Sequence, residues 1–247
     1  MGDSIGREFM RKTCYPHVPE SGQQRGEPQP ALELAYPADA RLIDLPDPAE
    51  CTILPQDLRQ VIEQRVSVRS YSAESLSLVE LSFLLWATQG VKAVTKRPVT
   101  LRTVPSAGAR HPFETYLLVN NVEGLEPGLY RYAAIEHALL RLEAPEDINE
   151  RITKACLEQT QVRTSAATFI WVAVVERMAW RYPERGYRYL HLDAGHVCQN
   201  LYLAAGVVAC GVCGIAAYDD EQINTELGLD GDNLFVIYIG SLGKLKK

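Results

Sequence analysis

The pattern of apolar residues predicts three main helices, at residues 55–65, 77–90 and 187–206. In each segment apolar side chains return every three or four residues, which places them on one helical face. The longest segment repeats this period over five turns, so it is expected to be a long helix with one buried side. Its periodic positions are Leu190, Ala194, Val197, Leu201 and Ala204.

Polar residues at the ends of these segments support the helix assignments. Ser77 and Glu80 have the spacing of a capping box, and Gly90 can end the same helix. Two shorter helices are predicted at 146–159 and 219–228, the second beginning with an Asp cap.

The remaining ordered segments have the apolar content and alternation of strands. The predicted strands are 114–121, 128–134, 138–143, 168–176, 207–217 and 234–240. Residues 91–104, rich in Thr, Lys and Arg, are expected to form a loop. Helices and strands do not alternate in a βαβ rhythm, and a hairpin lies mid-chain. We therefore predict an α+β fold with a mainly antiparallel central sheet.

Residues 1–54 differ from the rest of the chain, because they are rich in Pro and poor in apolar residues. We expect them to form an extended N-terminal arm, with 55–247 as the folded domain. Within the arm, "REFMRKTCY" and "LIDLPDP" are the segments that could attach to the body or to a partner.

Composition then narrows the class of protein. The net charge is −6 and the pI is about 5.5, which argues against a nucleic-acid-binding surface. The sequence contains neither a long apolar run nor an apolar core near its start, so we expect no membrane span, no signal peptide and a cytoplasmic location. The six Cys residues mostly lie in apolar segments, as reduced thiols do.

Several common motifs of chemistry are absent: the phosphate loop, the dinucleotide fingerprint and the serine elbow. "CGVC" (Cys210 and Cys213) lacks further ligands for zinc, so buried packing is favoured over a redox pair. In "HLDAGH", Asp193 and His196 share a helical face, and a polar contact is favoured over catalysis. No metal site is predicted.

Two other segments are better candidates for a binding site. In "RVSVRSY", Arg65, Ser67 and Arg69 alternate, so an extended chain would point two guanidiniums and a hydroxyl the same way, as a phosphate requires. A solvated charged edge is the equal alternative. In "TVPSAGARHPFET", the run of small residues before a strand would let a flat ligand lie against the backbone, whereas a plain connector is the simpler alternative.

These segments, in this order, resemble the nitroreductase family of FMN-dependent oxidoreductases. "TVPSAGARHPFETYLLVNNVEGLEPGLYRY" and "ERGYRYLHLDAGHVCQNLYLAA" resemble most closely its SagB-type subgroup, which includes azoline dehydrogenases and stand-alone proteins. The resemblance covers about residues 55–243. It implies an intertwined homodimer with FMN at the subunit interface, NAD(P)H as a transient reductant and a small-molecule substrate.

The resemblance also implies roles for individual residues. Arg65, Ser67 and Arg69 would hold the ribityl chain and phosphate of FMN, with Lys244 or Lys246 adding to the phosphate site. The other implied cofactor-binding residues are Pro105, Ser106, Ala107 and Gly108 along the ring, Gly214 and Ile215 behind it, and Gln199 and Asn200 near the ring or the dimer interface.

The resemblance departs at the candidate catalytic pair. Peptide-cyclising members use a Lys-Tyr pair just before the long helix, where this chain has Arg181 and Tyr182. An Arg does not readily give up its proton and is a poor general base. We therefore expect an NAD(P)H-dependent FMN oxidoreductase, with an azoline dehydrogenase and a non-catalytic flavin-binding protein as the alternatives.

Overall fold

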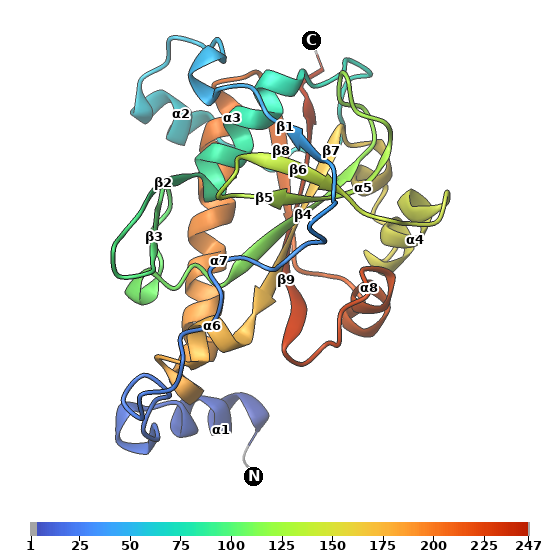
Figure 1. The fold of residues 1–247 in the computed structure, drawn as a ribbon. Coiled ribbons are helices and arrows are strands. Elements are labelled where there is room, and N and C mark those ends of the chain that lie inside the picture. The colour runs from blue at the N-terminus through green and yellow to red at the C-terminus, as the bar shows by residue number, and fades with distance from the viewer. Residues whose placement is uncertain (1–3, 247) are drawn as a thin grey trace.

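The fold is built on one seven-stranded sheet, seen in a computed structural model that describes residues 4–246 (Figure 1). The strand order is β1-β6-β5-β4-β7-β9-β8, and every neighbouring pair is antiparallel. The strands are β1 Leu42–Asp44, β4 Phe113–Val119, β5 Gly128–Ala133, β6 Ala138–Arg141, β7 Ala167–Val174, β8 Cys210–Ile215 and β9 Leu234–Lys244. The prediction of an α+β fold with a mainly antiparallel sheet is confirmed.

The interior strand β7 is buried on both sides, because its successive side chains alternate between two cores. Phe169 and Trp171 point into the larger core, whereas Ile170 and Val172 point into the smaller one. A strand with apolar residues at every position therefore needs helices on both faces of the sheet.

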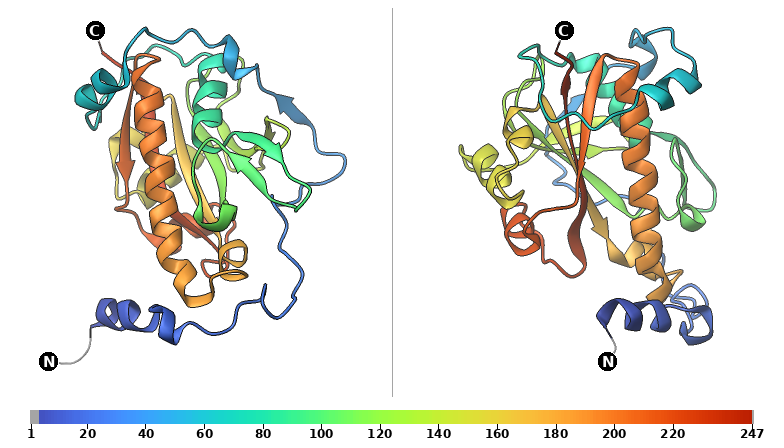
Figure 2. Two further views of the ribbon diagram at one scale, coloured as in Figure 1. Left: turned by 90° about the vertical axis from the view of Figure 1, so that its left-hand side faces the viewer. Right: turned by 180° about the vertical axis from the view of Figure 1, so that it is seen from behind.

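The helices provide these two coverings (Figure 2). On one face, α3 and the long α7 contribute to the larger core, and on the other, α4 and α8 contribute to the smaller one. The helices are α1 Ile5–Lys12, α2 Leu58–Gln64, α3 Leu78–Gln89, α4 Ile148–Ala155, α5 Thr160–Thr164, α6 Val175–Ala179, α7 Pro183–Gly206 and α8 Asp220–Glu226, with 3₁₀ turns at Tyr15–His17, Pro48–Glu50 and Ala107–Ala109. The capping box of Ser77 and Glu80 and the end of α3 at Gly90 are as predicted.

Several boundaries differ from the sequence prediction. The expected loop at 91–104 contains a two-stranded hairpin, β2 Val91–Val94 and β3 Thr100–Arg102. Its buried positions, Thr100 and Arg102, are polar, whereas apolar Val94 and Leu101 are exposed, so the sequence pattern gives no sign of strand burial. Helix α7 begins at Pro183, four residues earlier than predicted, since Pro is favourable in a first turn.

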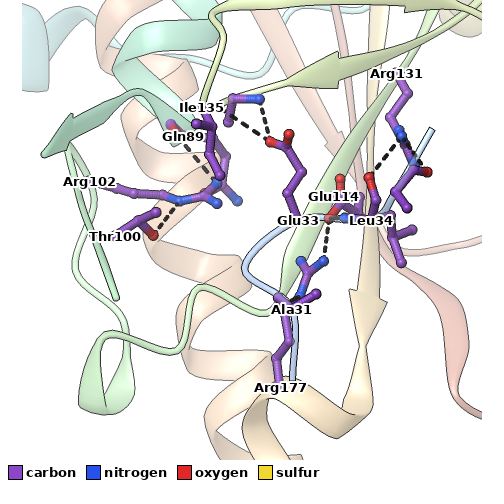
Figure 3. A network of polar contacts seen from close by, with 12 residues as sticks. Ala31, Glu33, Leu34, Gln89, Thr100, Arg102, Glu114, Arg131, Ile135 and Arg177 are labelled. Carbon is purple, nitrogen blue, oxygen red and sulfur yellow. Dashed lines mark hydrogen bonds and ion pairs between the residues drawn. The ribbon is translucent and has the colours of Figure 1, made fainter. Parts of the chain in front are cut away.

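The N-terminal arm has more regular structure than expected. "REFMRK" lies in helix α1, and "LID" is strand β1, which pairs with β6 at the edge of the sheet. The stretch between them is held by a buried polar network (Figure 3). The backbone carbonyl of Ala31 accepts from Arg177 at 2.8 Å, and those of Leu34 and Ala35 accept from Arg131.

Candidate functional site

The loop Pro105–His111, which joins β3 to β4, has a strained backbone. Gly108, Ala109 and His111 have φ values of 59°, 53° and 43°, a backbone region that residues other than Gly seldom adopt. Each such non-Gly residue costs on the order of 1–3 kcal/mol, and such strain tends to gather at functional sites. This backbone marks the loop as a candidate for a functional role.

Asp193 of α7 holds this loop in place. Its carboxylate is 4% exposed and accepts the backbone N–H of Ala107 at 3.3 Å. Burial raises the pKa of Asp193, while hydrogen bonds from Ser106 and Ala107 oppose the rise. The favoured reading of Asp193 as a simple contact with His196 missed this role, because its partner lies 86 residues away in the chain.

The candidate catalytic residues Arg181 and Tyr182 lie against the same loop. A Cβ added to Gly108 would stand 2.7 Å from the Tyr182 hydroxyl and 3.1 Å from Cδ of Arg181. Tyr182 also packs edge-to-face on Tyr189, with ring centroids 5.0 Å apart. The structure thus places both candidates beside the ring-binding segment expected from the sequence.

A second cluster forms around Tyr202, near the C-terminal end of α7. Its hydroxyl lies 3.0 Å from Ser67 Oγ and accepts the backbone N–H of Gly214 at 2.7 Å, while the Arg65 guanidinium lies 5.2 Å from its ring centre. Three predicted residues, from two distant segments of the chain, therefore meet at one tyrosine that the sequence did not single out.

The segment carrying Arg65, Ser67 and Arg69 is itself exposed, although its backbone is fixed. The N–H of Val68 donates to the carbonyl of Val212 on β8 at 2.8 Å. A Cβ on Gly211 would stand only 2.6 Å from that of Val68. A cavity of about 190 Å³ opens between this segment, α7 and β8. Exposed guanidiniums on an anchored segment suit a phosphate.

Lys244 does not lie among these free cations. Its side chain is buried and forms an ion pair with Glu80, and its ammonium also donates to the carbonyl of Val208 at 3.3 Å. Its charge is therefore already compensated, and its implied part in the phosphate site would require this pair to open. Lys246 is exposed.

The other implied residues are less closely grouped. Asn200 donates to the carbonyl of Ala87 on α3 at 2.9 Å, and Gln199 is exposed on α7. Ile215 is buried in the smaller core, with Gly214 before it beneath the Tyr238 hydroxyl.

The two clusters lie on opposite sides of α7. Asp193, which holds the loop, and Tyr202, which holds the basic segment, are nine residues apart. At about 100° and 1.5 Å per residue, this separation is half a turn in direction and about 13 Å in height. One chain therefore does not bring the two predicted parts of the site together.

The two cysteines of "CGVC" lie on opposite faces of the sheet. Cys210 and Cys213 are buried free thiols whose side chains enter different cores, in line with the packing interpretation. No group of three or more His, Cys, Asp or Glu side chains in residues 4–246 is placed to hold a metal ion. Within the same residues, every helix is too short or too polar for a membrane span.

Comparison with known proteins assigns the family. The model of the nitroreductase family matches residues 62–244, and the chain belongs to this family of oxidoreductases. A nitroreductase-like protein of Methanocaldococcus jannaschii is 35% identical over 202 residues, covering 82% of this chain and 97% of the relative. A nitroreductase-like crystal structure from Anabaena variabilis is 34% identical with a TM-score of 0.65, covering 77% of this chain and 38% of that one.

The chain is also similar to a toxin-processing protein and to further solved structures. The trifolitoxin-processing protein TfxB of Rhizobium leguminosarum is 31% identical over 133 residues, which are 52% of this chain and 36% of the relative. The fold also matches one chain in a structure of the microcin synthetase complex of E. coli (20% identity, TM-score 0.64, 97% of this chain and 87% of that one). A nitroreductase-like structure from Desulfovibrio desulfuricans, solved with FMN, matches less closely (19% identity, TM-score 0.54, 78% and 88%).

Proposed function

We propose that this protein is an FMN-dependent oxidoreductase that moves hydride from NAD(P)H to a small organic acceptor. The observation that carries the proposal is the strained small-residue loop Pro105–His111, held by the buried Asp193. Within this loop, residues 106–109 carry only small side chains. Membership of the nitroreductase family and the FMN bound to the Desulfovibrio desulfuricans protein of similar fold support a flavin as the ligand.

The residues of this chain fit FMN in two parts. Arg65, Ser67 and Arg69 present exposed cationic and hydroxyl donors on an anchored segment, which suits the phosphate and ribityl chain. Ser106 to Gly108 would lie along the ring. Bound flavin would supply the hydride chemistry, so the protein has to bind, orient and tune it.

A homodimer would join the two parts of the site. They lie on opposite sides of α7, and the helix surface between them carries the exposed residues Leu192, Gly195 and Gln199. Leu192 is 60% exposed, and Leu58, Ile62 and Val66 on or after α2 are also more than half exposed. Large apolar side chains that gather in one exposed patch mark a protein contact surface. We propose that the loop of one protomer faces the basic segment of its partner, with FMN between them.

The test is an absorption spectrum of the purified protein, taken before and after anaerobic NAD(P)H. The proposal expects a flavin spectrum that is bleached by NAD(P)H and restored by a nitroaromatic or quinone acceptor. A colourless protein that takes up no FMN would refute it. A bound flavin that neither NAD(P)H nor dithionite-coupled acceptors turn over would identify the non-catalytic alternative.

The relative TfxB favours one further candidate, a dehydrogenase acting on a heterocyclised peptide. Such an enzyme would oxidise an azoline peptide to the azole with flavin as the electron acceptor and would need no NAD(P)H. Arg181 argues against it, because a guanidinium is a poor base for removing the substrate proton. Mass loss of two hydrogens from an azoline peptide, without NAD(P)H, would support this candidate.

A further inference from the structure

Arg110, directly after the strained loop, is a buried cation with an incomplete set of partners. Its side chain is 6% exposed and lies over the ring of Trp180 at 5.2 Å. Its Nε donates to the carbonyl of Gly108 at 3.3 Å, yet its buried Nη2 has no hydrogen-bond partner. A buried guanidinium normally pairs with a carboxylate or another anion, because leaving it unpaired is costly.

The groups facing Arg110 add positive charge instead of compensating it. After burial, the largest causes that lower the pKa of Arg110 are the charges of Arg181 and Arg97. Arg181 follows Trp180 and lies against Gly108, and Arg97 is exposed between β2 and β3. None of these three arginines forms an ion pair with an acidic side chain in the described part of the chain.

This cluster lies at the site already proposed. Arg110 and Arg181 both touch Gly108, one at its carbonyl and the other where its Cβ would stand, and Tyr182 touches it too. The cluster around Tyr202, which includes Arg65 and Ser67, lies on the other side of α7. The basic segment for the phosphate of FMN and the three arginines are thus separate features.

We infer that Arg110 and Arg181, which meet at Gly108, form a subsite for the anionic group, a carboxylate or a phosphate, of a reactant of this enzyme, and that the exposed Arg97 adds positive charge to it. An anion there would accept from the free Nη2 of Arg110 and offset the repulsion between the three guanidiniums. Arg suits this task, since its planar group binds carboxylate and phosphate through paired hydrogen bonds. The inference rests on the proposed function for the identity of the reactant.

Steady-state kinetics of the FMN-loaded protein tests the subsite. One arm compares 4-nitrobenzoate with 4-nitrobenzamide as acceptors at fixed NADH, and the other compares NADPH with NADH at a fixed neutral acceptor. The inference expects kcat/KM to favour the anionic member of at least one pair. In Arg97→Gln and Arg181→Gln that preference should fall about tenfold, the loss of one charge-assisted hydrogen bond.

Lys92→Gln is the matched control. It removes one exposed cation from the same hairpin but away from the three arginines, so the preference should not change. A preference in the first arm identifies the acceptor as the source of the anion, and one in the second arm identifies the 2′-phosphate of NADPH. No preference in either arm, or equal loss for charged and neutral reactants in the two Arg variants, would overturn the inference.

Direct binding separates this inference from the proposed function. Benzoate or inorganic phosphate should change the tryptophan fluorescence of the protein without added FMN, whereas benzamide should not, because Trp180 lies against Arg110. The change should be absent in Trp180→Phe and weakened about tenfold in Arg181→Gln. Anion binding by a protein that takes up no FMN would refute only the proposed function. Flavin turnover without anion preference or binding would refute only the subsite.

Discussion

Glu33, in the N-terminal arm, links the stability of the protein to pH. Its carboxylate accepts the backbone N–H groups of Ala134 at 2.6 Å and Ile135 at 3.3 Å, within the network of Figure 3. Burial, followed by the nearby charge of Glu114, raises its pKa from 4.5 to about 7. Glu114 is bound by Arg177 at 2.6 Å, so its charge is held beside Glu33.

The direction of the change in stability with pH follows from which state, folded or unfolded, keeps the proton on Glu33. Between pH 4.5 and 7 the folded state keeps a proton on Glu33 that the unfolded state has released, so stability falls as the pH rises. At about 1.4 kcal/mol per pH unit, the free energy of unfolding should fall by about 3 kcal/mol between pH 4.5 and 7. Glu33→Gln keeps both acceptor contacts but cannot ionise, so its stability should lack this fall.

The effect of Glu33 has to be measured as the difference between wild type and Glu33→Gln, because another group changes stability with pH in the opposite direction. Burial lowers the pKa of His111 from 6.5 to about 3, so the neutral ring in the folded state adds stability as the pH rises through that range. The wild-type curve alone can therefore look flat. His111 is the same in both proteins and cancels in their difference.

The assay is urea unfolding of wild type, Glu33→Gln and the exposed control Glu143→Gln from pH 5 to 8. Glu33→Gln should gain on wild type by about 2.5 kcal/mol between pH 5 and 8, with most of the change below pH 7. Glu143→Gln should run parallel to wild type. Parallel curves for wild type and Glu33→Gln would show that the carboxyl of Glu33 is not shifted and that the reasoning is wrong.

Three further changes test other contacts. Gly211→Ala should cost about 1–3 kcal/mol of unfolding free energy, because the new Cβ would crowd the basic segment. In the control Gly195→Ala the new Cβ has no other atom within 4 Å, so the change should stabilise α7 by up to about 1 kcal/mol. Equal stabilities of the two variants would contradict this. Lys244→Met should cost about 3 kcal/mol of unfolding free energy, because it leaves the partly buried Glu80 without its partner. The double variant with Glu80→Gln should recover part of that loss. Asp193→Ala should speed amide hydrogen exchange in residues 106–111, because the loop loses its acceptor; unchanged exchange would show that the loop is held by its own turns.

Most of the sheet and its helices could be predicted from the sequence, since their apolar periodicity reflects burial. Strand β7 and helices α3 and α7 have long patterns, and the capping box marks the start of α3. The hairpin β2–β3 and helix α1 could not be predicted in this way, because they bury few apolar side chains. What defines them is contact with other parts of the chain.

The candidate site shows the same limit. The residue types of Arg65, Ser67 and the small-residue loop could be recognised locally, whereas their supports could not. Tyr202 and Asp193 act on partners 135 and 86 residues away, and no local pattern distinguishes them from other polar residues on α7. The family resemblance implies Lys244 or Lys246 at the phosphate, and only the folded chain reveals Glu80 beside Lys244.

The pairing of β1 with β6 has a consequence for any shortened form of this protein. Residues Leu42 to Asp44 cover the outer edge of the sheet, with Leu42 opposite Leu140. A chain starting at residue 55 would present β6 as a bare edge, ready to pair with a neighbouring molecule. It would also leave the guanidiniums of Arg131 and Arg177 without the carbonyl acceptors that the arm supplies. Such a fragment should accumulate as insoluble aggregates, even though every helix over the sheet remains.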